Sequence, residues 1–73
     1  MQELDVIGLK CPLPALRTEK ALAALPAGRH LSILADDPLA PLDITHLCNK
    51  AGHELLSTTP LDGGGWRFII RRG

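Results

Sequence analysis

The sequence predicts an α+β fold, a two-layer sandwich in which two helices pack on one face of a mixed four-stranded sheet. Three observations support this fold class. Short stretches with alternating apolar and polar residues favour strands, two longer stretches with apolar residues at helical spacing favour helices, and the stretches follow one another in the order βαβαββ. Because the chain has only 73 residues, we expect a single domain over residues 1–73.

The first half of the chain predicts a strand, a helix and a second strand. Residues 4–7 alternate in polarity and end at Gly8, which favours a short, half-buried strand. Residues 12–25 form the first predicted helix, which Pro26 and Gly28 end. Its apolar face consists of Ala15, Thr18, Ala21, Leu22 and Leu25. Alternation returns at residues 31–35, and the Asp36-Asp37-Pro38 string that follows is typical of a turn with capping carboxylates.

The second half predicts a helix and a β-hairpin. Residues 39–51 carry an apolar stripe at helical spacing, and Gly52 ends the helix. The stripe consists of Ala40, Ile44, Leu47, Cys48 and Ala51. Residues 53–59 and 66–71 favour strands, and the glycine-rich residues 60–65 between them suit a hairpin connection. Trp66, Phe68 and Ile70 would face the helices, which leaves the opposite face of the sheet open to solvent.

Composition and charge limit the classes of function. Hydrophobic residues make up 45% and charged residues 22%, as is usual for a globular protein. Eight basic residues balance eight acidic ones, and the sequence offers no aromatic platform for bases, so we expect no direct nucleic-acid binding. Whether Arg67, Arg71 and Arg72 contact a partner stays open. No apolar run approaches the ~20 residues that span a bilayer, and the amino terminus lacks a signal-peptide pattern, so we expect a cytoplasmic protein without membrane association.

The two cysteines are expected to be free thiols with different roles. A pair so far apart in the sequence forms no disulfide framework, and a reducing cytosol would keep both sulfurs reduced. Cys48 lies on the apolar stripe of the second predicted helix, so we expect it in the core. The three histidines and two cysteines lack the short paired spacings of a zinc site, and we therefore expect no metal.

Cys11 stands directly before the first predicted helix, in the string Gly8-Leu9-Lys10-Cys11-Pro12-Leu13-Pro14. Pro12 is predicted at the first helical position and Pro14 within the first turn, where a missing N–H costs no helical hydrogen bond, so both prolines would fix the direction of the cysteine. The helix dipole and the adjacent Lys10 are expected to lower the pKa of the thiol. These residues alone leave open whether Cys11 is a reactive thiol or an inert core residue.

Over nearly its whole length the chain resembles the bacterial TusA-like (SirA/YedF-like) sulfur carriers. The residues that carry the resemblance are Asp5, the Gly8-Leu9 pair and the Cys-Pro-x-Pro signature of Cys11, Pro12 and Pro14. Further matches follow in the expected order, at Asp36-Asp37-Pro38, Asp43-Ile44, Cys48 and Gly52-His53-Glu54-Leu55. The resemblance implies a two-layer sandwich of βαβαββ order.

The resemblance also implies a sulfur carrier of the sulfurtransferase type. Cys11 would accept sulfur as a persulfide from a cysteine desulfurase or another sulfurtransferase and relay it to an acceptor protein, for tRNA thiolation or another branch of sulfur metabolism. Pro12 and Pro14, with Gly8, would support the site, and no cofactor is implied. Whether the chain counts as an enzyme stays open. The alternatives are a non-enzymatic regulatory or interaction module and a thiol redox sensor.

An exposed apolar patch is expected beside Cys11. Leu13 and Leu16 lie off the predicted core face of the first helix, and the basic residues Lys10, Arg17 and Lys20 surround them. Exposed apolar area with a charged rim often marks an interface, so these five residues form a hypothetical docking patch for donor and acceptor proteins. The alternative is that loops cover the two leucines.

Overall fold

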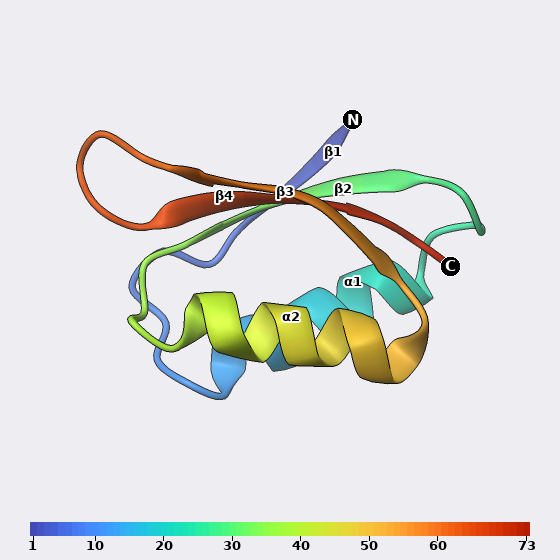
Figure 1. The fold of residues 1–73 in the computed structure, drawn as a ribbon, viewed down its shortest axis with the longest axis horizontal. Helices are drawn as coiled ribbons and strands as arrows, with labels where there is room; N and C mark the ends of the chain where they lie inside the picture. Colours follow the sequence, from blue (N-terminus) through green and yellow to red (C-terminus); the bar gives the residue numbers. More distant parts are fainter.

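The computed structural model describes residues 1–73 and contains six elements in the predicted order βαβαββ (Figure 1). The strands are β1 (Gln2–Asp5), β2 (His30–Ala35), β3 (Glu54–Pro60) and β4 (Trp66–Arg71). The helices are α1 (Leu13–Ala23) and α2 (Ala40–Ala51). Neither helix has the length and the apolar character that crossing a bilayer requires.

The four strands form one mixed sheet in the order β1-β2-β4-β3. β1 and β2 are parallel, whereas β4 pairs antiparallel with both β2 and β3. The two helices lie side by side against one face of this sheet, and the other face carries no helix (Figure 1). The predicted α+β sandwich, with two helices on one face of a mixed four-stranded sheet, is confirmed.

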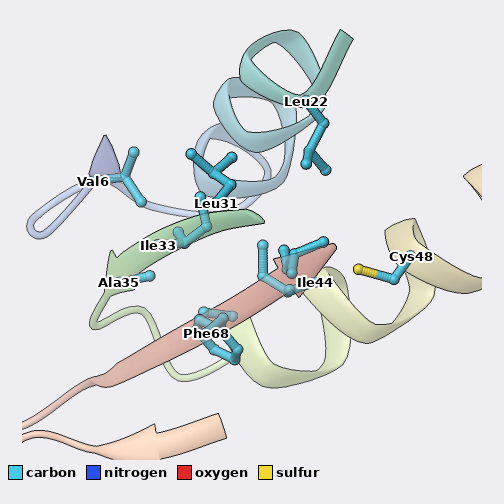
Figure 2. Packing of buried hydrophobic residues seen from close by; sticks show 10 residues of the cluster. Val6, Leu22, Leu31, Ile33, Ala35, Ile44, Cys48 and Phe68 are labelled. Atoms are coloured by element: carbon cyan, nitrogen blue, oxygen red, sulfur yellow. The ribbon is translucent and has the colours of Figure 1, made fainter. Parts of the chain in front are cut away.

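The core lies between the sheet and the two helices, and the predicted faces account for most of it. Figure 2 shows side chains from β2 and β4 meeting Leu22 of α1 and Ile44 and Cys48 of α2. The buried cluster consists of Val6, Leu22, Leu31, Ile33, Ala35, Ala40, Ile44, Cys48, Phe68 and Ile70. Cys48 is only 1% exposed, which confirms its predicted place in the core.

Several predicted boundaries and faces need correction. α1 begins at Leu13 rather than Pro12 and ends at Ala23 rather than Leu25, because the N–H groups of Ala24 and Leu25 bond to carbonyls only three residues back. β1 begins two residues earlier than predicted, and β3 covers 54–60 rather than 53–59. Ala51 is exposed, because it is the last residue of α2, directly before Gly52 turns the chain out of the helix.

Candidate functional site

The loop between β1 and α1 is held by a hydrogen bond from each of four successive backbone N–H groups. Val6 donates to the Leu34 carbonyl at 2.8 Å, and Leu9 donates to the Val6 carbonyl at 3.1 Å. The Ile7 N–H donates to the Asp5 carboxylate at 2.9 Å, and the Gly8 N–H donates to Oδ1 of Asp36 at 2.9 Å. The loop that leads to Cys11 is therefore tied to β2 and to the turn after it.

Gly8 and Asp36 have positions that explain their residue types. Gly8 has φ +87°, a left-handed conformation that glycine adopts without steric cost. Asp36 and Asp37 were predicted to be turn and cap residues, and they serve backbone N–H groups as expected. Asp37 accepts from the Leu39 N–H at 3.0 Å, directly before α2.

Pro12 and Pro14 both lie at the start of α1, one position earlier in the helix than predicted. Pro12 is the N-cap and Pro14 the second helical residue, so Cys11 precedes the cap. The Cys11–Pro12 peptide bond is cis. Pro14 is buried, and Oγ1 of the fully buried Thr18 donates to its carbonyl at 2.7 Å. The start of α1 is thus anchored to the core by the second proline of the motif.

Cys11 is exposed and lies at a groove of about 200 Å³ between α1 and α2. We call this the interhelical groove; its lining residues are Cys11, Pro12, Ala15, Leu16, Glu19, Asp43, His46, Leu47 and Lys50. Apolar side chains from both helices line it together with two acidic and two basic residues. A partner molecule that reaches the sulfur therefore meets both helices.

The electrostatic surroundings of Cys11 are opposite to those expected from the sequence. The pKa of its thiol is raised above the ordinary value, first because the Asp43 carboxylate can accept a hydrogen bond from the S–H, and then through partial desolvation and the negative charges of Asp43 and Asp37. The negative charges of the two carboxylates act in the same direction as this hydrogen bond. The prediction that the helix dipole and Lys10 lower this pKa was wrong.

The amino-terminal turn of α1 has few N–H donors to offer the sulfur. Pro12 and Pro14 have no N–H. The Leu13 N–H donates to the Lys10 carbonyl at 2.8 Å, and the Leu16 N–H donates to the Pro12 carbonyl at 3.1 Å. Only the Ala15 N–H is left without a backbone acceptor.

The five residues of the hypothetical docking patch are all exposed. Leu13 is 43% and Leu16 53% exposed, so loops do not cover them. Of the five, only Leu16 lines the interhelical groove; Lys10, Leu13, Arg17 and Lys20 lie outside it. The α2 side of the groove was not predicted: Asp43 was identified only through the family resemblance, and His46 and Lys50 lie off the predicted apolar stripe of this helix.

The three carboxyl-terminal arginines all have partners within the chain. Arg67 pairs with Glu3 of β1 at 3.2 Å on the helix-free face of the sheet. Arg71 lies 3.7 Å from Glu54, its cross-strand neighbour. Nε of Arg72 donates to the Leu22 carbonyl at 2.8 Å. No group of three or more histidine, cysteine or acidic side chains is arranged to hold a metal ion.

Comparisons with known proteins agree on one family. The family model described as sulfurtransferase TusA matches residues 2–72. A protein of Neisseria meningitidis serogroup B, named as a candidate sulfur carrier, is 50% identical over 62 residues, which are 85% of this chain and 84% of the relative. The sulfur carrier protein TusA of Allochromatium vinosum is 39% identical over 71 residues, 97% of this chain and 92% of the relative.

A solved structure supports the same assignment. The crystal structure of the SirA-like protein from Desulfitobacterium hafniense superposes with a TM-score of 0.88 at 28% sequence identity, and the match covers 100% of this chain and 99% of that one. With its βαβαββ order, its Cys-Pro-x-Pro motif and these matches, the chain belongs to the TusA family of sulfur carrier proteins.

Proposed function

We propose that this chain carries sulfur as a persulfide on Cys11, which it receives from a cysteine desulfurase or another sulfurtransferase and passes to an acceptor protein. The observation that supports this best is that the cysteine of the family motif is exposed at the interhelical groove, whereas Cys48 is buried. Persulfide exchange requires one accessible sulfur and no cofactor. We place the relay in the cytoplasm, where a free exposed thiol stays reduced.

The transfer is an exchange between two sulfur–sulfur bonds. The Cys11 thiolate attacks the terminal sulfur of the donor persulfide, a bond forms between Cys11 Sγ and that sulfur, and the donor's own sulfur–sulfur bond breaks. The donor sulfur leaves as a thiolate and takes up the proton that Cys11 has lost. Cys11 is oxidised and the donor is reduced by the same two electrons, so no outside oxidant takes part. A thiol of the acceptor protein repeats the exchange and restores Cys11.

The rigid loop and the two prolines support this role by fixing the sulfur. The Gly8 N–H donates a hydrogen bond to the Asp36 carboxylate, and the Thr18 hydroxyl donates one to the Pro14 carbonyl. A sulfur held at a constant position requires less ordering when a partner docks. We propose that Pro12, Pro14 and Gly8 act in this way, and that residues 1–73 work as one domain.

The docking patch of Lys10, Leu13, Leu16, Arg17 and Lys20 remains our proposal for the surface that meets donor and acceptor proteins. Its two leucines are exposed on the same helix that begins beside Cys11. Replacing Leu13 or Leu16 by serine should slow sulfur transfer while leaving the fold intact, since both side chains lie outside the core. Unchanged transfer rates in both folded variants would exclude the patch. We also propose that the acceptor protein uses this sulfur for tRNA thiolation or in another branch of sulfur metabolism.

Intact-mass measurement tests the persulfide directly. The protein is incubated with a cysteine desulfurase and cysteine, and one added sulfur atom is sought on the wild type and on the Cys11→Ser and Cys48→Ser variants. We expect loading on the wild type and on Cys48→Ser, and none on Cys11→Ser. A wild-type protein that stays unloaded, or loading that survives Cys11→Ser, would show that Cys11 is not the carrier. The redox-sensor alternative would instead show a mixed disulfide under oxidant, or a Cys11–Cys48 bridge that Cys48→Ser abolishes.

A further inference from the structure

The interhelical groove brings together Cys11, which precedes α1, and Asp43, which belongs to α2. Cys11 precedes α1, and Asp43 lies in the first turn of α2, where its N–H donates to the Leu39 carbonyl at 2.9 Å. The first turn of a helix stabilises a negative charge. Asp43 is half-buried, and it has no ion pair in the chain, since the two ion pairs present are Arg67–Glu3 and Arg71–Glu54. Asp43 thus lines the groove without an ion-pair partner in the chain.

The other charged groups near the sulfur form no ion pair with this carboxylate. Asp37 adds a second negative charge, which also acts on the Cys11 thiol, although its Oδ2 already accepts from the Leu39 N–H. Glu19 of α1 and the α2 residues His46 and Lys50 line the groove, and Lys10 precedes Cys11 in the chain. None of these basic side chains forms an ion pair with Asp43.

We propose that Asp43 is a specificity-determining residue, which favours sulfur donors that carry a positive charge beside their reactive sulfur and disfavours anionic ones. The inference deepens the proposed function, on which it rests, by naming the chemistry of the donor group that enters the groove. A desulfurase segment with a lysine or arginine next to its persulfide fits this site. A small persulfide that carries carboxylates does not.

The physical reason is the charge that develops during transfer. Attack by Cys11 breaks the donor's sulfur–sulfur bond and leaves a thiolate on the donor, in the same groove as Asp43. A cationic group on the donor lies close to both negative charges and stabilises them, whereas a donor carboxylate adds a third negative charge. The same carboxylate raises the pKa of the free Cys11 thiol, so it opposes negative charge on the sulfur of the carrier as well.

A set of three small disulfides tests the proposal without any partner protein. Cystamine is cationic, hydroxyethyl disulfide is neutral and dithiodipropionate is anionic, and each forms a mixed disulfide with an accessible thiolate while one thiolate leaves. Second-order rate constants with Cys11 are measured on Cys48→Ser protein, so that a single thiol reacts. The variants are Asp43→Asn, Asp43→Glu and Asp62→Asn, the last of which removes an equal charge from the distant β3–β4 turn.

The quantity compared is the ratio of the cystamine rate to the dithiodipropionate rate. Each probe has its own leaving group, but that difference cancels when the ratio for a variant is divided by the ratio for the parent. We expect Asp43→Asn to lower the preference for cystamine by roughly two- to fivefold, the effect of one partly exposed charge pair. Asp43→Glu should keep most of the preference, and Asp62→Asn should leave it unchanged. At about 1 M salt the difference between parent and Asp43→Asn should shrink, because the screening length falls to roughly 3 Å.

An equal preference in the parent and in Asp43→Asn would overturn the proposal, as would an equally large loss in Asp62→Asn. Should Asp43→Asn fail to fold, the parent protein still decides, because a cystamine preference that does not weaken with salt contradicts a charge effect. Disulfide exchange needs no sulfur carriage, so a negative result here leaves persulfide loading on Cys11 unaffected. Conversely, an intact charge preference with no loading in the mass measurement would refute the proposed function alone.

Discussion

The hydrogen bond between Gly8 and Asp36 offers a sharp test of how the Cys11 loop is held. Asp36→Ala removes the acceptor that lies 2.9 Å from the Gly8 N–H, and no other side-chain hydrogen bond of Asp36 exists in the structure. Both residues are exposed, so water replaces the lost partner, and we expect a loss of about 1 kcal/mol in the free energy of unfolding. Asp36→Asn keeps an oxygen at the same place and should lose less.

Two measurements report this loss. In a domain of this length, about 1 kcal/mol corresponds to a fall of roughly 4–8 °C in the melting temperature. The same energy equals roughly a fivefold increase in the local opening equilibrium, so the Gly8 amide should exchange with deuterium about five times faster in Asp36→Ala. Asp62→Ala is the matched control, because Asp62 is exposed and makes no side-chain hydrogen bond.

If Asp36→Ala has the melting temperature of the wild type and its Gly8 amide exchanges at the wild-type rate, the Gly8–Asp36 hydrogen bond does not hold the loop. An equal loss in Asp62→Ala would mean that removing any acidic side chain has this effect. Either result refutes the reasoning that connects Asp36 to the position of Cys11.

Three further predictions concern the thiol, the core and the hairpin. Because the pKa of Cys11 is raised, its alkylation rate should reach half-maximum at a higher pH than in the same chain unfolded in urea, measured on Cys48→Ser; an equal or lower midpoint contradicts the role of Asp43 and Asp37. Leu22→Ala should cost roughly 2–5 kcal/mol in urea unfolding because Leu22 is fully buried, whereas Leu16→Ala should stay within about 0.5 kcal/mol. Gly65→Ala should destabilise the fold by roughly 1–2 kcal/mol, since Gly65 has φ +83° and an added Cβ would lie 2.6 Å from the Ala35 carbonyl oxygen. Gly63→Ala is the control, because Gly63 has open space around it. Equal melting temperatures of the two variants would contradict the argument.

Local patterns in the sequence predicted the parts of the fold that depend on local rules. The alternation of Trp66, Phe68 and Ile70 with polar or outward-facing residues correctly predicted the bounds of β4, because a strand with one buried face has a period of two. The helical spacing of Ile44, Leu47 and Cys48 identified the core face of α2 for the same kind of reason. Helix ends were less predictable, since they depend on individual hydrogen bonds at the last turn.

Contacts between distant segments could not be predicted in this way. Asp43 affects Cys11 only because α1 and α2 pack side by side, and nothing in the residues around Cys11 indicates which α2 side chain faces it. Arg67 similarly has no acidic neighbour in sequence, yet the strand order brings Glu3 within 3.2 Å across β2. The electrostatics of this surface are therefore a property of the tertiary fold.

Asp43, whose carboxylate acts on the Cys11 thiol, is directly bonded to a core residue. Asp43 is followed directly by Ile44, which is fully buried against the sheet, so the packing of α2 sets where the carboxylate lies. On the other side of the groove, buried Pro14 and Thr18 set where α1 begins. In a domain with helices on only one face of its sheet, the two inner helix faces build the core and the groove between the outer faces stays accessible. Exposure of the sulfur and control of its protonation thus follow from the same helix packing.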